Sequence, residues 1–115
     1  YESIYMDLDT LPHEEFWILY LNQSNRLLEK YRLSKGGITQ TTVDLRLAFK
    51  RAFEVGATGL ILAHNHPSGG LTPSSSDEQI TRKFKLAAAS VDLRILDHLI
   101  VSKKGYFSFA DEGLL

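Results

Sequence analysis

Two histidines and an aspartate stand close together in this sequence, at a spacing that suits a metal site. His64 and His66 end the apolar run at 60–63, and Asp77 follows a loop at 65–76. Side chains at i and i+2 of a strand point to the same side, so both imidazoles face one point beyond the strand end. Two histidines and one carboxylate leave a fourth tetrahedral position for water, as in catalytic zinc sites. Because zinc lowers the pKa of bound water to about 7, the pattern predicts a metal-dependent hydrolase.

Hydrolysis at such a site also needs a group that accepts a proton from water and returns it to the leaving group. Glu14 and Glu15 open the first predicted strand, and strand alternation allows only one of them to face the metal. A hydroxyl near the metal would stabilise the tetrahedral oxyanion. Ser74 is the candidate for this role.

The same residues also have ordinary structural interpretations. Ser74 and Asp77 have the spacing of a capping box, which would only begin a helix. A histidine at a strand end is often a packed residue with one hydrogen bond, and glutamates beside a turn are usually exposed. The residue pattern alone leaves these alternatives open.

Hydrophobic periodicity predicts the elements that position this loop, in the order β-β-α-β-α-β-β. Strands are predicted at residues 16–21, 26–34, 59–64, 94–102 and 106–109, and helices at residues 41–55 and 77–90. Thr41 and Asp44 are expected to begin the first helix, and Gly56 to end it. The order indicates an α/β fold, an α+β mixed sheet with flanking helices, in a single domain over residues 1–115.

Composition restricts the function classes. The chain has 115 residues, no cysteine and a formal net charge of −1. The lack of cysteine excludes disulfides, thiolate zinc ligands and a thiol nucleophile. The balanced charge disfavours a nucleic-acid-binding domain without excluding a local basic patch. The longest apolar run, residues 60–63, is too short to span a bilayer, and we expect a cytoplasmic domain without a membrane segment.

The pattern His64-x-His66-Pro67, followed by Ser74 and Asp77, resembles the JAMM motif of the JAB/MPN zinc metalloproteases. The surrounding sequence is similar to the C-terminal domain of the bacterial RadC proteins, from about residue 14 to the end of the chain. The stretches that carry this similarity are Glu14-x-Phe16, Leu60 to Gly69, Pro73-Ser74, Leu96-Asp97-His98-x-Ile100 and Tyr106-x-Ser108-Phe109.

This resemblance implies a JAB/MPN fold with a three-layer arrangement like that of the cytidine deaminases. It implies zinc as the cofactor, with His64, His66 and Asp77 as its ligands. It also implies that the Ser74 hydroxyl supports the oxyanion and that a glutamate acts as general acid and base.

The resemblance favours Glu14 as that glutamate, because Glu14 stands two residues before Phe16, as in RadC proteins. In some archaeal relatives the glutamate directly precedes the phenylalanine, which would favour Glu15. We also expect the chain to correspond to the C-terminal domain alone, without the helical N-terminal region of full-length RadC proteins.

Three functions follow as hypotheses. Family members of known activity cleave isopeptide bonds to ubiquitin-like tails, so the first hypothesis is a zinc metallopeptidase or isopeptidase with a peptide or protein substrate. Because RadC proteins are named for DNA repair, the second is an accessory module that binds DNA without hydrolysis. Its basic patch would comprise Lys50-Arg51, Arg82-Lys83-x-Lys85 and Lys103-Lys104, which are otherwise solvated helix faces and a turn.

The third hypothesis is a domain that mediates association, for example as a homo-oligomer, with a structural zinc ion. Phe16, Trp17 and Tyr20 would contribute to its surface, although core packing explains them equally well. His98, beside Asp97, is either a hydrogen-bond partner of a metal ligand or a packed histidine.

Overall fold

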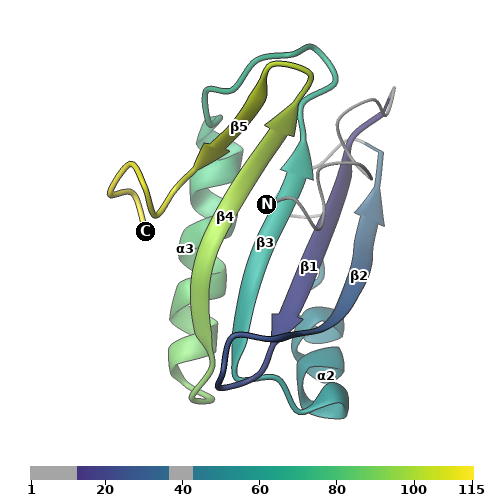
Figure 1. Cartoon of the computed structure of the whole chain (residues 1–115), viewed down its shortest axis with the longest axis vertical. Coiled ribbons are helices and arrows are strands. Elements are labelled where there is room, and N and C mark those ends of the chain that lie inside the picture. The colour runs from purple at the N-terminus through teal and green to yellow at the C-terminus, as the bar shows by residue number, and fades with distance from the viewer. Residues whose placement is uncertain (1–12, 37–42) are drawn as a thin grey trace.

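A five-stranded mixed sheet and two helices form the part of the chain that the computed structural model describes, residues 13–36 and 43–115 (Figure 1). The elements are β1 (Glu15–Leu21), β2 (Leu27–Lys35), α2 (Leu45–Val55), β3 (Gly59–Asn65), α3 (Ser75–Ala89), β4 (Arg94–Ser102) and β5 (Gly105–Ser108). The predicted order and the α/β class are confirmed, and each strand begins and ends within one residue of its predicted bounds.

The strand order places the start of β1 beside the end of β3. The order across the sheet is β2-β1-β3-β4-β5, with β3 and β4 parallel and the other neighbouring pairs antiparallel. Two parallel strands need a long crossover connection, and α3 lies in that connection. In the antiparallel pair of β1 and β3, Phe16 is the partner of His64. Residues just before β1 are thereby brought next to the histidine pair.

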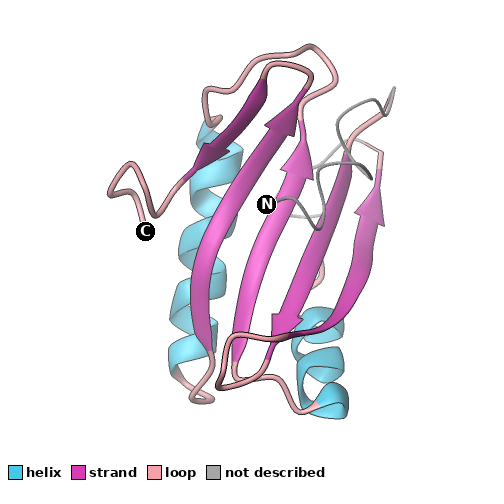
Figure 2. Ribbon diagram, viewed as in Figure 1, coloured by secondary structure: helices cyan, strands magenta, loops and turns pink. Residues whose placement is uncertain are grey.

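Both helices cover one face of the sheet, and the main hydrophobic core lies between them and the strands (Figure 2). Strand alternation directs Phe16, Ile18 and Tyr20 to this face, where they join a cluster with Ala48 of α2 and Phe84 of α3. The core interpretation of Phe16 and Tyr20 is therefore confirmed. The described residues supply two layers of the expected three-layer arrangement.

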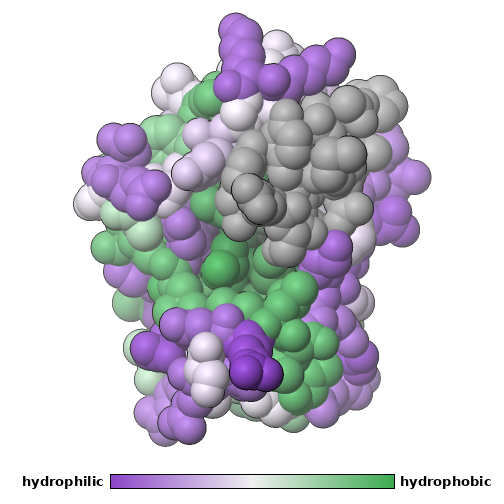
Figure 3. Space-filling model, viewed as in Figure 1, coloured by the Kyte–Doolittle hydropathy of each residue, from purple (hydrophilic) through white to green (hydrophobic). Residues whose placement is uncertain are grey.

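The opposite face of the sheet carries a second, smaller hydrophobic cluster. It consists of Leu19, Ala63, Leu99 and Val101, with Trp17 packed against it. Figure 3 views this face and shows hydrophobic residues gathered over its lower half. The alternation of the central strands thus separates the core side, where the helices and the histidines lie, from this second side.

Both predicted helix starts need correction. The helix α2 begins at Leu45, because the Asp44 carboxylate accepts a hydrogen bond from the backbone N–H of Arg46 and caps the helix directly. The predicted start at Thr41 lies outside the described residues. The helix α3 begins at Ser75, two residues before the predicted start, because Ser74 is its N-cap.

Candidate metal centre

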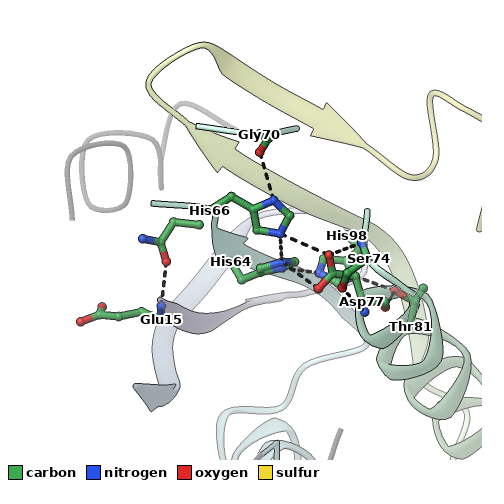
Figure 4. A network of polar contacts seen from close by, with 9 residues as sticks. Glu15, His64, His66, Gly70, Ser74, Asp77, Thr81 and His98 are labelled. Carbon is green, nitrogen blue, oxygen red and sulfur yellow. Dashed lines mark hydrogen bonds and ion pairs between the residues drawn. The ribbon is translucent and has the colours of Figure 1, made fainter. Parts of the chain in front are cut away.

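The side chains of His64, His66 and Asp77 converge on one point at the end of β3 (Figure 4). One ligand atom from each lies within 4.8 Å of the other two. The Nε2 atoms of the two histidines are 3.0 Å apart. The Asp77 oxygens lie 3.0 Å from His64 Nε2 and 3.2 Å from His66 Nε2. Among the described residues, these three form a group with the donor types of a metal site.

The donor set fits a zinc ion. Ligand bonds of about 2.0–2.1 Å in tetrahedral geometry place neighbouring ligand atoms about 3.4 Å apart, close to the separations of 3.0–3.2 Å in this cluster. His66 Nδ1 lies 3.0 Å from the carbonyl oxygen of Gly70. An Nδ1–H that donates to this carbonyl leaves the lone pair of His66 Nε2 for a metal, as is usual for metal-binding histidines.

Asp77 belongs both to a capping box and to the cluster of candidate ligands, so its position is compatible with both interpretations of its spacing from Ser74. The Ser74 hydroxyl oxygen accepts a hydrogen bond from Asp77 N–H at 3.0 Å, and Asp77 Oδ2 accepts one from Ser74 N–H at 2.8 Å. These bonds form a capping box at the start of α3. The box fixes the carboxylate while its oxygens still face His64 and His66.

The cluster is electrostatically coupled. Burial alone would raise the pKa of Asp77, but the adjacent His64 and His66 side chains outweigh burial and hold the pKa far below its usual range. The hydrogen bond to Asp77 raises the pKa of His66, against the opposing effect of burial. Asp77 is therefore a carboxylate anion at neutral pH, which is the form that binds a metal.

A pocket of about 420 Å³ opens beside the cluster. The residues that line it are Glu14, His66, Pro67, Ser68, Ser74 and Asp77. The pocket thus contains two of the three candidate ligands together with Glu14 and Ser74, the two residues predicted to assist hydrolysis. Because the Ser74 oxygen accepts from Asp77 N–H, its O–H remains a donor.

Glu15 lies away from this pocket, on the other side of β1. It is buried, and its carboxylate accepts hydrogen bonds from Trp17 Nε1 at 2.9 Å and from Arg32 at 3.5 Å, and contacts His13 Nε2 at 2.9 Å. Burial opposes ionisation, but the bonds from His13 and Trp17 and the charge of Arg32 prevail, so the pKa of Glu15 is below its usual value. Of the two neighbouring glutamates, the structure places Glu14 beside the candidate ligands.

No role was predicted from the sequence for Asn65, whose side chain makes hydrogen bonds to the backbone on both sides of Glu14. Its Oδ1 accepts from Glu15 N–H at 2.7 Å, and its Nδ2 donates to the His13 carbonyl at 2.8 Å. The two residues that flank Glu14 are thus held to the end of β3. Asn65 is separated from them by about fifty residues, and this distance in sequence left no local signal.

Replacing Asn65 with alanine should reduce the free energy of unfolding by about 2–4 kcal/mol. The change leaves a backbone N–H and a carbonyl without their partner at a site where Asn65 is buried. Asn22 offers a matched control, because its Oδ1 accepts two backbone N–H bonds in an exposed turn, and Asn22→Ala should cost about 1 kcal/mol or less. Urea denaturation followed by circular dichroism measures the free energy of unfolding of both variants. Equal losses would contradict the role of Asn65 in holding the backbone on both sides of Glu14.

Two further polar residues adjoin the cluster on its buried side. His98 of β4 and Thr81 of α3 are both buried, and His98 Nε2 lies 2.8 Å from His64 Nδ1. Complete burial, together with the charge of His64, holds the pKa of His98 well below its usual value. His98 is thus a hydrogen-bond partner of a candidate ligand, one of its two predicted roles. Thr81 could have been identified from the sequence, because it follows Asp77 by one turn of the same predicted helix.

The basic residues considered for DNA binding lie on separate elements. Lys50 and Arg51 are on α2, residues 82–85 are on α3, and residues 103–104 form the turn between β4 and β5. Arg51 is paired with Glu29 and Glu54. None of the described helices has the length and apolar character needed to cross a membrane.

Comparisons with known proteins agree on one family. A family model for RadC-like JAB domains matches residues 1–114. A UPF0758 protein of Flavobacterium johnsoniae is 61% identical over 104 residues, which cover 90% of this chain and 45% of the relative. A UPF0758 protein of Porphyromonas gingivalis is 47% identical over 116 residues, covering 100% of this chain and 51% of the relative. The UPF0758 protein YfjY of Escherichia coli is 49% identical over 105 residues, covering 91% and 66%. The chain spans about half the length of the first two relatives.

Proposed function

The chain belongs to the family of RadC-like JAB domains, and on this premise we propose that it is a zinc-dependent hydrolase that cleaves an amide bond in a peptide or protein. One observation carries the proposal: three ligand atoms meet within 4.8 Å at a pocket that Glu14 and Ser74 also line. A structural zinc site has four protein ligands, whereas three leave a position open for chemistry.

In this proposal His64 Nε2, His66 Nε2 and one Asp77 oxygen hold the zinc ion. When bound, zinc supplies a Lewis acid that polarises an amide carbonyl and acidifies water. The side chains that line the pocket transfer the proton and stabilise the oxyanion. Asp77 contributes a negative charge that compensates part of the charge of the ion, and the capping box keeps its carboxylate in place.

Glu14 accepts a proton from the attacking water and donates it to the nitrogen of the leaving amine. A glutamate suits both steps, since its carboxylate accepts a proton and its carboxylic acid then donates one. The Ser74 O–H donates to the oxyanion that develops on the carbonyl oxygen. The pocket volume of about 420 Å³ admits a short extended segment around the scissile bond.

Two measurements test the proposal. Protein expressed with zinc supplementation should contain about one equivalent of zinc, measured by mass spectrometry of all first-row metals. The same protein should cleave members of a library of peptides and ε-lysyl isopeptides, read by mass spectrometry, and a chelator should stop the cleavage. Less than about half an equivalent of zinc, uptake of another metal instead, or cleavage that survives the chelator would overturn the proposal.

A further inference from the structure

His98 and Thr81 form a buried chain of hydrogen bonds that begins at His64 and ends at the backbone of Asp77. From His64 Nδ1 the chain runs 2.8 Å to His98 Nε2, and from His98 Nδ1 it runs 2.6 Å to Thr81 Oγ1. The Thr81 hydroxyl then donates to the Asp77 carbonyl at 2.9 Å. The chain joins β3, β4 and α3, and its two ends are residues of the candidate metal centre (Figure 4).

The direction of these bonds follows from their last member. The Asp77 carbonyl can only accept a hydrogen bond, so the single hydroxyl proton of Thr81 points to it. The Thr81 oxygen must then accept from an Nδ1–H of His98. A neutral His98 with its proton on Nδ1 has a lone pair on Nε2, which accepts from an Nδ1–H of His64. The proton of a neutral His64 is then on Nδ1, and Nε2 keeps its lone pair.

The opposite direction is unfavourable at the Thr81 end of the chain, and it would occupy the atom of His64 that faces the candidate ligands. If Thr81 donated to His98, two oxygens without a proton between them would face each other at 2.9 Å. A neutral His64 would then carry its proton on Nε2, which lies 3.0 Å from the Asp77 carboxylate, and this atom would have no lone pair for a metal.

Packing holds the rings in the orientation that this chain requires. His98 is fully buried, stacked on Phe109 with ring centroids 4.7 Å apart, and it meets the edge of Phe16 at 5.7 Å. His64 is stacked on Phe16 with centroids 5.9 Å apart. A ring flip in either histidine would replace a ring nitrogen in the chain with a carbon atom and break the bonds.

We propose that Thr81 and His98 are positioning residues that set the tautomer of His64, so that its Nε2 is ready to bind the metal. The inference rests on the proposed function, because it assigns a purpose to the lone pair of His64 Nε2. It adds two residues that touch neither the metal nor the substrate. Hydrogen-bond partners of metal-binding histidines commonly contribute about 10–100-fold in metal affinity.

The test compares Thr81→Val with Thr81→Ser, using zinc alone as the probe. Valine has the shape of threonine but no hydroxyl, whereas serine keeps the hydroxyl. Zinc affinity, measured by competition with a chromophoric chelator, should fall about 10–100-fold in Thr81→Val and recover to within about threefold of wild type in Thr81→Ser. Thr58→Val is the matched control, because the buried Thr58 hydroxyl makes no hydrogen bond in the described structure, and its zinc affinity should not change.

Nitrogen-15 NMR of the histidine rings supplies a readout that does not depend on metal binding. Wild-type protein should show a proton on Nδ1 of both His64 and His98, and Thr81→Val should lose this preference at His98. A wild-type His64 without a proton on Nδ1, or unchanged zinc affinity in a folded Thr81→Val variant, would overturn the inference. If wild-type protein takes up no zinc, the proposed function fails, while the tautomers of the metal-free protein still decide whether the chain runs in this direction.

Discussion

Replacing His64 with alanine should lower the zinc affinity of this domain by at least about a hundredfold and abolish the hydrolytic activity that we propose for it. Binding free energies of about 10–16 kcal/mol for four-ligand zinc sites correspond to about 2.5–4 kcal/mol for each ligand, and each 1.4 kcal/mol is a factor of about ten. The loss at His64 should lie in the upper part of this range, because its Nε2 contacts both other candidate ligands. Equilibrium dialysis followed by metal analysis measures the affinity.

His13→Ala is the matched control for this experiment. His13 is partly exposed, and its Nε2 contacts Glu15 at 2.9 Å, outside the cluster of candidate ligands. We expect its zinc content to equal that of wild type. Asp77→Asn adds a second comparison, because the amide keeps an oxygen for the capping bond with Ser74 but loses the charge. Full zinc occupancy in a folded His64→Ala variant would show that the zinc ion binds at another site.

Replacing Glu14 with glutamine should reduce kcat by about 10²–10⁴-fold while the zinc content stays at the wild-type level. Glutamine keeps the size of the side chain but has no group that accepts a proton at neutral pH, and general acid–base catalysis contributes about this factor. Glu14 lines the pocket without belonging to the group of candidate ligands. Metal binding and catalysis should therefore separate in this variant, measured on a peptide that the wild-type protein cleaves.

Glu15→Gln distinguishes the two neighbouring carboxylates. The Glu15 carboxylate makes its polar contacts with His13, Trp17 and Arg32, on the other side of β1. We expect kcat to stay within about threefold of wild type, with the main cost in stability, about 1 kcal/mol for the weakened hydrogen bonds to a charged group. A larger loss of kcat in Glu15→Gln than in Glu14→Gln would reverse the assignment of the general base.

Local features of the chain were predictable from the sequence because each depends on a few neighbouring residues. Every strand lies within one residue of its predicted bounds, since alternation and turn residues act over short distances. The placement of two histidines on one side of a strand end follows from the same period of two residues. The helix starts were less predictable, because several neighbouring polar residues could cap each helix, and the structure uses Asp44 and Ser74.

The candidate site also depends on contacts between residues far apart in the sequence, which local patterns do not predict. The sequence by itself determined that His64 and His66 share one side and that one of two glutamates can face them, and it placed Asp77 within the first turn of the next helix. Only the tertiary structure shows that Glu14, and not Glu15, lines the pocket beside the candidate ligands, since this depends on the pairing of Phe16 with His64 across forty-eight residues. The partners of Asn65 and the chain from His64 through His98 also arise from pairings between strands and a helix. A hydrogen bond between residues far apart in sequence leaves no periodic trace in either segment, and the folded sheet alone brings its two atoms within reach.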